Sequence, residues 1–271
     1  MVFDTHTHTE MSSDSKMPAA QAISAARRAG LGIIFTEHYD ADFSGEPGLF
    51  RVDAERYLSE YAPLRAPDVL LGVELGLTET SRAANLALVE SRAFDFLLGS
   101  VHTVWARDIY MDFTGHFTGE AKAKNSERGP LITAEAYFKC VRDMLTSHDY
   151  IDSFGHIDYP HRYFSGPAAK LSESFAYAAN TEAYDAIFDA LIETGTAFEI
   201  NTRRLGQYAA EKELSLIYRR YAEKGGKYVT IGSDAHNPRD IGANFKKALR
   251  IASESGLTAV CFRGRVMEEI K

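Results

Sequence analysis

The chain has 271 residues, of which 45% are hydrophobic and 25% are charged, so it can bury a sizeable core. Its formal net charge of −8 disfavours nonspecific binding to nucleic acid or to an anionic membrane. With two cysteines, no disulfide framework is expected, and neither a basic leader nor a membrane-length apolar run is found. These features favour the cytoplasm.

Short apolar runs alternate with amphipathic stretches of helical period along most of the chain. The predicted strands are 2–4, 32–36, 69–75, 94–101, 150–154, 197–201, 228–233 and 258–262. The predicted helices between and after them are 18–29, 53–62, 81–91, 134–146, 181–193, 211–224 and 244–255. Strand and helix alternating this often predict a parallel sheet closed into an α/β barrel. No linker divides the chain, so residues 1–271 are expected to form one domain.

Two stretches break this alternation. Residues 105–132 contain three glycines, a proline and many polar residues without a sustained period, and residues 158–180 contain two prolines and an aromatic-basic cluster. Loops of this length in a compact domain are usually functional or disordered. Because both follow strands that end in histidines, we expect them to form walls or lids over a substrate.

Six of the nine histidines follow the ends of apolar runs and lie beside carboxylates. The segments are Asp4-Thr5-His6-Thr7-His8 with Asp14, Thr36-Glu37-His38, Gly72-Val73-Glu74, Gly99-Ser100-Val101-His102, Phe154-Gly155-His156 and Gly232-Ser233-Asp234-Ala235-His236. The carboxyl ends of the strands carry the chemistry of α/β barrels. His6 and His8 are two residues apart, as are Asp234 and His236, so each pair projects to one side of an extended segment.

Each of these residues alone has an ordinary structural explanation. Glu74 could pair with an arginine, and Asp234 could cap a helix. Together, six histidines with matched carboxylates are difficult to satisfy in a core without metal ions. Imidazole and carboxylate are ligands of borderline divalent metals, and no cysteine joins the set. The pattern predicts two or three ions and metal-assisted hydrolysis.

The ordered segments resemble the polymerase and histidinol phosphatase (PHP) family, most closely its stand-alone histidinol-phosphate phosphatase branch. The resemblance spans nearly the whole chain. It implies a distorted (β/α)7 barrel, one strand short of the usual eight. The eighth predicted strand, 258–262, is therefore expected to lie outside the ring.

The resemblance also implies three neighbouring metal ions, with zinc preferred and manganese or iron open. The implied ligands are His6, His8, Glu74 and Asp234 for the first ion, Glu74, His102 and His156 for the second, and Asp14, His38 and His236 for the third. Glu74 would bridge two ions about 3.5–4 Å apart, as in two-metal phosphoryl transfer. Glu74 and Asp234 are accordingly placed among the catalytic residues.

Several neighbouring residues are given secondary roles or none. Glu37 either orients His38 through its free ring nitrogen or makes a surface salt bridge. Asp4 is a second candidate for orienting the histidine pair. His116, His148 and His161 fall outside the pattern, and His148 is expected on the surface.

A phosphate ester also requires cationic donors, and the planar guanidinium of arginine suits its oxygens. Arg162 follows His156 by six residues, and Arg203 follows the predicted strand 197–201. The histidinol phosphatase branch has arginines in similar segments, so Arg162 and Arg203 are expected to bind phosphate and to act in catalysis. Arg204 is expected to be solvated or salt-bridged.

The resemblance implies a metal-dependent phosphomonoesterase that hydrolyses L-histidinol phosphate in histidine biosynthesis. A hydroxide bridging two ions would attack phosphorus in line with the leaving oxygen. Alternatives are another PHP phosphoesterase acting on phosphotyrosine or nucleotides, an amidohydrolase-type barrel, and a non-catalytic domain stabilised by metal. An amidohydrolase would need a carboxylated lysine where the segment ending in His102 offers histidine.

Overall fold

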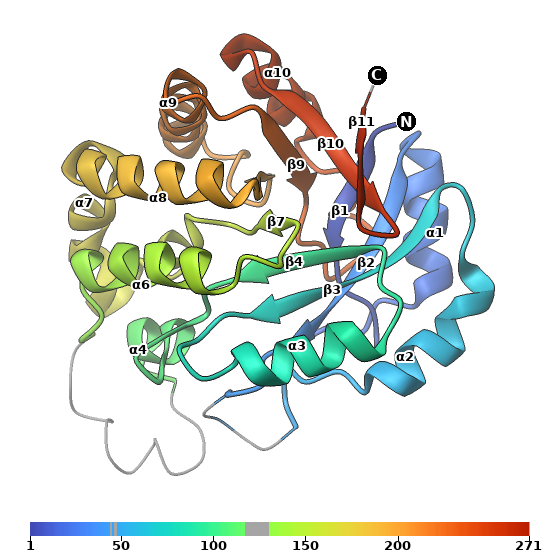
Figure 1. Cartoon of the computed structure of the whole chain (residues 1–271). Coiled ribbons are helices and arrows are strands. Elements are labelled where there is room, and N and C mark those ends of the chain that lie inside the picture. Colours follow the sequence, from blue (N-terminus) through green and yellow to red (C-terminus); the bar gives the residue numbers. More distant parts are fainter. Residues whose placement is uncertain (44, 46–47, 117–129, 271) are drawn as a thin grey trace.

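The computed structural model of the protein describes residues 1–43, 45, 48–116 and 130–270 (Figure 1). Seven parallel strands form the central sheet, and their spatial order follows the chain. They are β1 (Phe3–Thr7), β2 (Gly32–Tyr39), β3 (Val69–Gly76), β4 (Phe96–Ser100), β7 (Ser153–Phe154), β8 (Ala197–Asn201) and β9 (Tyr228–Gly232). Each coincides with a predicted strand to within a few residues.

The sheet closes between its first and seventh strands. Thr7, the last residue of β1, forms a parallel bridge with Ala235, just beyond β9. The backbone N–H of His8 donates to the carbonyl of Ala235 at 2.9 Å. The buried carboxylate of Asp4 holds the same seam, because its Oδ1 accepts from the N–H of Ser233 at 2.9 Å. Closure after seven strands confirms the expected distorted (β/α)7 barrel.

Two further strands form an antiparallel hairpin beside this ring. β10 (Thr258–Arg263) pairs with β9 at Thr258 and Ala259 and then turns back into β11 (Val266–Glu269). The ring of Phe262 stacks on that of Phe96 with centroids 5.5 Å apart, so β10 contributes to the apolar core that also contains residues of β1 to β4 and β8. The eighth predicted strand therefore lies outside the ring, as expected from the family resemblance.

Helices cover the outside of the barrel (Figure 1). The longer ones are α1 (Ala19–Arg28), α2 (Ala54–Tyr61), α3 (Arg82–Ser91), α6 (Ala134–Ser147), α8 (Thr181–Thr194), α9 (Tyr208–Glu223) and α10 (Phe245–Ser255). A short 3-10 helix, Ala62–Leu64, follows α2. Asp53 caps α2 by accepting from the N–H of Arg56, and Gly195 ends α8 in the left-handed conformation that glycine adopts at low cost. Among the described residues, no helix has the length and apolar character needed to cross a membrane.

Short elements form the two segments that broke the strand-helix alternation. The first begins inside a hairpin of β5 (Thr103–Val104) and β6 (Arg107–Asp108) and then contains α4 (Ile109–Thr114); residues 117–129 of the predicted wall lie outside the described residues. The second contains 3-10 helices at Tyr159–Tyr163, Gly166–Leu171 and Tyr177–Ala179, with α7 (Ser172–Phe175) between the last two. The rings of Phe113 and Phe164 join the segments, with centroids 5.4 Å apart.

Candidate metal centre

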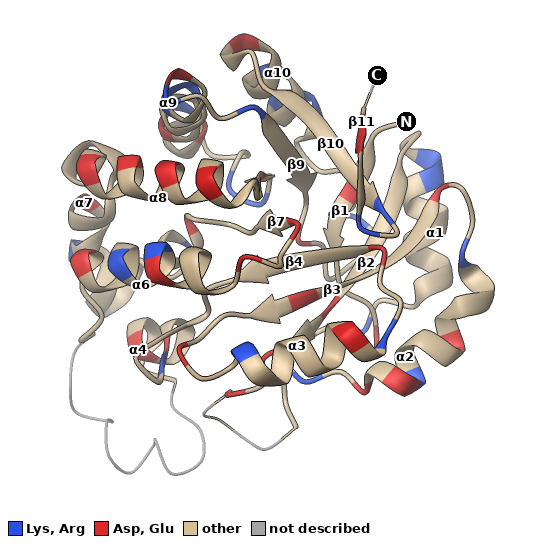
Figure 2. Ribbon diagram, viewed as in Figure 1, with Lys and Arg blue, Asp and Glu red and all other residues tan. Residues whose placement is uncertain are grey.

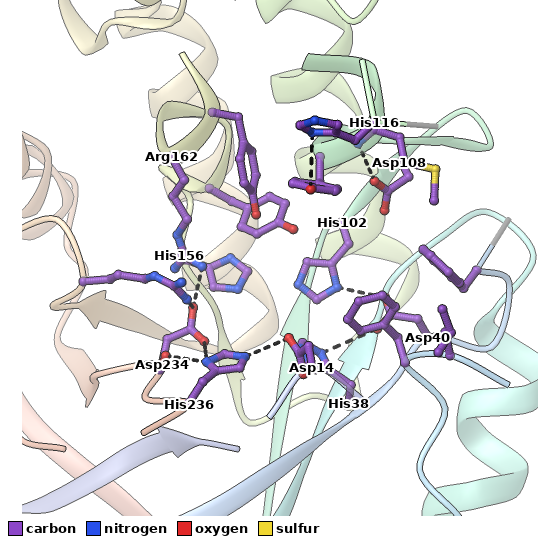
Figure 3. Close-up of a pocket in the computed structure, with 18 residues that line it drawn as sticks. Asp14, His38, Asp40, His102, Asp108, His116, His156, Arg162, Asp234 and His236 are labelled. Carbon is purple, nitrogen blue, oxygen red and sulfur yellow. Dashed lines mark hydrogen bonds and ion pairs between the residues drawn. The ribbon is translucent and has the colours of Figure 1, made fainter. Parts of the chain in front are cut away.

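The predicted ligands meet at the carboxyl ends of the barrel strands, and Figure 3 shows six of them: Asp14, His38, His102, His156, Asp234 and His236. All nine come from six strands or the turns after them: His6, His8 and Asp14 from β1 and its loop, His38 from β2, Glu74 from β3, His102 after β4, His156 after β7, and Asp234 and His236 after β9. Asp234 has a φ of 55°, a conformation that costs energy for most residues but that Asp tolerates better. This segment after β9 carries two of the nine side chains into the site.

Glu74 lies at the centre, and its two oxygens face different histidines. Oε2 lies 2.9 Å from Nδ1 of His38 and 3.4 Å from Nε2 of both His6 and His8. Oε1 lies 3.0 Å from Nε2 of His156 and 3.3 Å from Nε2 of His102. A carboxylate with one oxygen on each side is the arrangement that bridges two cations.

The other two carboxylates each face two of the histidines. Oδ1 of Asp234 lies 3.4 Å from Nε2 of His8 and 3.7 Å from Nε2 of His6. Oδ2 of Asp14 lies 2.8 Å from Nε2 of His236 and 3.4 Å from Nε2 of His38. Asp14 is therefore well placed to share an ion with these two histidines.

Four sets of three side chains bring their ligand atoms within 4.8 Å of one another: His6, His8 and Glu74; His6, His156 and Asp234; His38, Glu74 and His102; and His8, His38 and His236. The first set matches part of the first implied group. The other three sets differ from the implied groups, because His156 also approaches His6 and Asp234, His38 also approaches Glu74, and His8 also approaches His236. The donor atoms form one continuous cluster with no gap between the implied groups.

The side chains of the cluster do not satisfy one another's hydrogen-bonding groups, but their arrangement suits metal ions. Within the described residues, Oε2 of Glu74, Nδ1 of His38 and Oδ2 of Asp234 are buried without a well-directed hydrogen bond. Nε2 of His6 faces Nε2 of His8 at 3.1 Å, so two ring nitrogens point at the same place. Oε2 of Glu74 and Oδ2 of Asp234 have only ion-pair contacts, the closest of them with His38 and Arg162. Buried polar atoms normally make directed hydrogen bonds, and three that do not, within one cluster of N and O donors, indicate that cations complete it.

Charge within the cluster is strongly coupled. Burial alone would raise the pKa of Glu74, but the imidazoles of His6, His38 and His102 hold it well below its usual range. Burial opposes the charged form of His102, but Asp40 and Glu74 raise its pKa to about 10. Without cations the site therefore holds protons on imidazoles, and metal ions compete with those protons for the ring nitrogens.

Two carboxylates that the sequence analysis did not identify orient the ligands. Oε1 of Glu199, in β8, lies 2.7 Å from Nδ1 of His6, and its Oε2 accepts from the N–H of His156 at 2.7 Å. Oδ1 of Asp40 lies 2.8 Å from Nδ1 of His102. Carboxylates on the far nitrogen of a ligand histidine fix its tautomer and ring orientation. Asp40 could have been identified from the sequence, because it lies two residues beyond His38 on an extended segment and so projects to the same side.

Both interpretations of Glu37 were wrong. Glu37 is fully buried and accepts from the backbone N–H of Thr9 at 3.1 Å and from the hydroxyl of Ser12 at 2.6 Å. Alternation along β2 directs its side chain away from the ring of His38. Glu37 therefore anchors the loop that carries Asp14. Asp4 likewise bonds at the β1–β9 seam, to Ser233.

The three remaining histidines have different surroundings. The prediction that His148 is on the surface was wrong, because it is 1% exposed and its Nδ1 lies 3.1 Å from the carbonyl of Met144. His161 is largely buried against the rings of Phe164 and Phe175. His116 lines the cavity wall, on the ring of Tyr110.

Arg162, Arg203 and Arg204 differ in their ion-pair partners and in their exposure. Nη1 of Arg162 lies 2.5 Å from Oδ2 of Asp234, and the Arg162 side chain is 9% exposed. Nη1 of Arg203 lies 3.5 Å from the same oxygen, and its side chain is 49% exposed. Both line the cavity. Arg204 instead donates to Oδ2 of Asp158 at 2.7 Å, as the salt-bridge interpretation expected.

A cavity of about 540 Å³ opens over the cluster, a volume typical of small-molecule sites. Its floor contains ligand candidates such as His102 and His156, and Arg162 and Arg203 stand beside them. Aromatic and aliphatic side chains form the remaining walls: Phe43, Leu49, Phe50, Tyr110, Met111, Tyr159 and Tyr163.

Comparison with known proteins places this cluster in a family. The family model described as PHP domain matches residues 4–203. The chain belongs to the PHP domain family. The match includes seven of the nine ligand candidates, and β9 then delivers Asp234 and His236 from beyond it. Membership sets aside the amidohydrolase alternative.

Curated relatives align with nearly the whole chain. It is 39% identical over 268 residues to a probable histidinol-phosphatase of Clostridium acetobutylicum, with 99% of each chain covered. It is 28% identical to a histidinol-phosphatase of Lactococcus lactis, over 93% of this chain and 91% of the relative. The crystal structure of histidinol phosphate phosphatase from Lactococcus lactis, complexed with zinc, L-histidinol and phosphate, aligns with a TM-score of 0.83 at 26% identity and 98% coverage of both chains.

Proposed function

We propose that this PHP-family protein is a metal-dependent phosphomonoesterase that hydrolyses L-histidinol phosphate to L-histidinol and phosphate. The observation that carries the proposal is Glu74, whose two oxygens face separate sets of histidines; His38, His102 and His156 of these sets line a cavity that Arg162 also lines. Relatives at 39% and 28% identity are named as histidinol-phosphatases, and the structural neighbour holds L-histidinol and phosphate.

The ligands that we propose are the nine side chains of the predicted set, arranged around three divalent ions. Zinc is the preferred metal, since the structural neighbour contains it and the donors are nitrogen and oxygen; manganese and iron share this donor preference. When bound, such ions polarise phosphoryl oxygens and lower the pKa of coordinated water towards 7. Glu74 would hold two ions, and Asp234 would bind one while anchoring Arg162.

The two arginines would bind the ester phosphate. Burial would lower the pKa of Arg162, but the carboxylate of Asp234 raises it, so the guanidinium stays charged. Tyr159 supports it, with the Arg162 guanidinium carbon 5.1 Å from the ring centroid. Arg203 stands at the more exposed side of the same carboxylate. A guanidinium supplies two parallel donors to phosphate oxygens and stabilises charge that develops on them during transfer.

We also propose that residues 1–271 form one domain in which 105–132 and 158–180 wall the substrate. Support comes from their described parts, since Asp108, Tyr110, Tyr159 and Tyr163 line the cavity. The net charge of −8 favours a small phosphorylated substrate over nucleic acid, and charged positions on α8 are all acidic (Figure 2). A cytoplasmic location is part of the proposal and rests on the two unpaired, buried cysteines.

A phosphate-release screen of the zinc-loaded protein tests the function. Histidinol phosphate, phosphotyrosine and nucleoside monophosphates would be compared by kcat/KM. The proposal expects histidinol phosphate to be preferred, and a preference for either other ester would assign the protein to another PHP phosphatase activity. Metal-free protein that stays folded and is inactive, and that regains activity with zinc, would exclude a purely structural role for the ions.

A further inference from the structure

Two polar side chains near the end of β8 face the inside of the barrel. Glu199 and Asn201 are two residues apart on this strand, so alternation turns them to the same side of the sheet. Glu199 is fully buried and Asn201 is 3% exposed. Since Glu199 contacts Nδ1 of His6, Asn201 also projects into the barrel, one step closer to the carboxyl ends of the strands and to the arginines.

The side-chain amide of Asn201 bonds in two directions. Its Oδ1 accepts from Nη2 of Arg162 at 3.2 Å and from the backbone N–H of Arg203 at 3.2 Å. Its Nδ2 donates to Oε2 of Glu199 at 3.1 Å. A reversed amide would set its NH₂ group against two donors and its oxygen against a carboxylate. The position therefore requires a side chain that accepts at one end and donates at the other.

The guanidinium of Arg162 depends on Asn201 for its orientation. The side chain is 9% exposed, and its Nη1 lies 2.5 Å from Oδ2 of Asp234 (Figure 3). That oxygen makes no well-directed hydrogen bond, and Nε of Arg162 is buried without a partner. Within the described residues, the bond to Asn201 is the only directed hydrogen bond that this side chain donates. Asp234 therefore attracts the charge, while Asn201 sets the plane of the guanidinium.

Asn201 also connects Arg162 to the carboxylate that orients the histidines. Oε2 of Glu199 accepts from Asn201 and, at 2.7 Å, from the backbone N–H of His156. The bond from the N–H of Arg203 spans two residues, and such a bond holds the backbone in a tight turn. One amide therefore links the positions of both arginines to Glu199 and, through it, to the metal-ligand candidates.

We propose that Asn201 positions the phosphate-binding arginine: it fixes Arg162 relative to the metal ligands, so that one phosphate contacts the guanidinium and the ions together. The proposal rests on the proposed function in assigning the phosphate to Arg162. Asn201 does not line the cavity, so it acts through Arg162 and not by touching substrate. Of the five N–H groups of a guanidinium, one faces Asp234 and one bonds to Asn201, which leaves three for an anion. A donor that is already oriented stabilises the phosphoryl group without reorganisation.

A double-mutant cycle tests whether Asn201 acts through Arg162. The four zinc-saturated proteins are the wild type, Asn201→Ala, Arg162→Ala and the double variant. The dissociation constant of inorganic phosphate is measured by calorimetry, and kcat/KM is measured with p-nitrophenyl phosphate and with L-histidinol phosphate. An effect that is transmitted through Arg162 disappears once Arg162 is absent, whereas an independent effect is additive.

Asn201→Ala is expected to weaken phosphate binding and to lower kcat/KM about 10-fold, near the low end for a hydrogen bond to a charged group. In the Arg162→Ala background the same substitution should change neither quantity. Zinc content should stay at the wild-type value, because Glu199 keeps its contacts with both ligand segments. Asn201→Ser should behave in the same way, since its shorter side chain withdraws from Arg162, although the hydroxyl can still accept from the N–H of Arg203.

The matched control is Asn85→Ala. Asn85 is a fully buried asparagine on α3, where its Nδ2 donates to the carbonyl of Gly76 at 3.1 Å, and it does not line the cavity. Both substitutions remove a buried amide, so both should lower the melting temperature. Only the Asn201 variants should weaken phosphate binding, which separates positioning from a general loss of stability.

Three results would overturn the inference: wild-type phosphate affinity in both Asn201 variants, an equal loss in the wild-type and Arg162→Ala backgrounds, or an equal loss of phosphate affinity in Asn85→Ala. Failure of the proposed function gives a different pattern. A protein that hydrolyses p-nitrophenyl phosphate but not L-histidinol phosphate would refute the proposed substrate, while the phosphate titrations would still measure the coupling. If Arg162→Ala itself left phosphate affinity unchanged, the inference would fail even in an enzyme that hydrolyses L-histidinol phosphate.

Discussion

Oε1 of Glu199 lies 2.7 Å from Nδ1 of His6, and both side chains are fully buried. This contact fixes which nitrogen of the ring carries a proton, because the carboxylate accepts from Nδ1 and leaves Nε2 free to face Glu74 at 3.4 Å. The same carboxylate also accepts from the N–H of His156. One side chain on β8 therefore orients two segments that carry ligand candidates.

Glu199→Gln should weaken zinc binding by roughly 10- to 100-fold, the usual effect of removing a carboxylate that orients a ligand histidine. The amide is neutral, and its NH₂ group must face one of the donors that now bond to Glu199. The measurement is a competitive zinc titration against a chelator, with kcat/KM at saturating zinc. Wild-type zinc affinity in this variant would show that His6 needs no such support.

Glu74→Ala should abolish turnover and lower zinc content, because it removes the oxygens that face two sets of histidines. Metal analysis after dialysis and a phosphate-release assay check both parts. Glu90→Ala, at an exposed position of α3, is the control and should change neither quantity. His116 cannot serve as a control because it lines the cavity. Full zinc occupancy with near-normal activity in Glu74→Ala would remove Glu74 from the site.

The order of strands and the cluster at their ends were predictable from local patterns. Apolar runs end at His38 and Glu74, and the family resemblance explained why strand 258–262 lies outside the ring. Glu199 was missed because it reads as one polar residue inside a buried strand, and its partner His6 is 193 residues away. β11 was missed because its residues are mostly exposed and its sequence has no sustained apolar alternation, although it pairs with β10 and Met267 packs against the apolar core.

Neither cysteine is expected to act as a nucleophile. Burial raises the pKa of Cys140 from 9.0 to about 12 and that of Cys261 from 9.0 to about 11. At a pH below these pKa values, each unit by which the pKa is raised lowers the thiolate fraction tenfold. Alkylation of the folded protein should therefore be roughly 100- to 1,000-fold slower than alkylation of the unfolded chain. The rate should rise with pH throughout the range from 7 to 9. Iodoacetamide labelling followed by mass spectrometry measures it, and Cys140→Ser should retain activity.

Substitutions of the three arginines in the site region should have different effects on activity and stability. Arg162→Ala and Arg203→Ala should keep zinc and fold but lose kcat/KM by about 10- to 150-fold, which corresponds to about 1.5–3 kcal/mol for a charge-assisted contact. The loss should be larger for Arg162, whose guanidinium is buried against Asp234, than for Arg203, which is half exposed. Arg→Lys should recover part of it, since one charge replaces a two-pronged donor.

Arg204→Ala is the contrasting variant, because Arg204 pairs with the buried Asp158 and does not line the cavity. Removing one member of a buried pair leaves an uncompensated charge and costs about 3–5 kcal/mol of stability. Its melting temperature should therefore fall by several degrees while kcat/KM per folded molecule stays near wild type. Inhibition by inorganic phosphate should weaken in the Arg162 and Arg203 variants alone. If inhibition by inorganic phosphate weakened only in Arg204→Ala, the phosphate would be bound by Arg204 and not by Arg162 and Arg203.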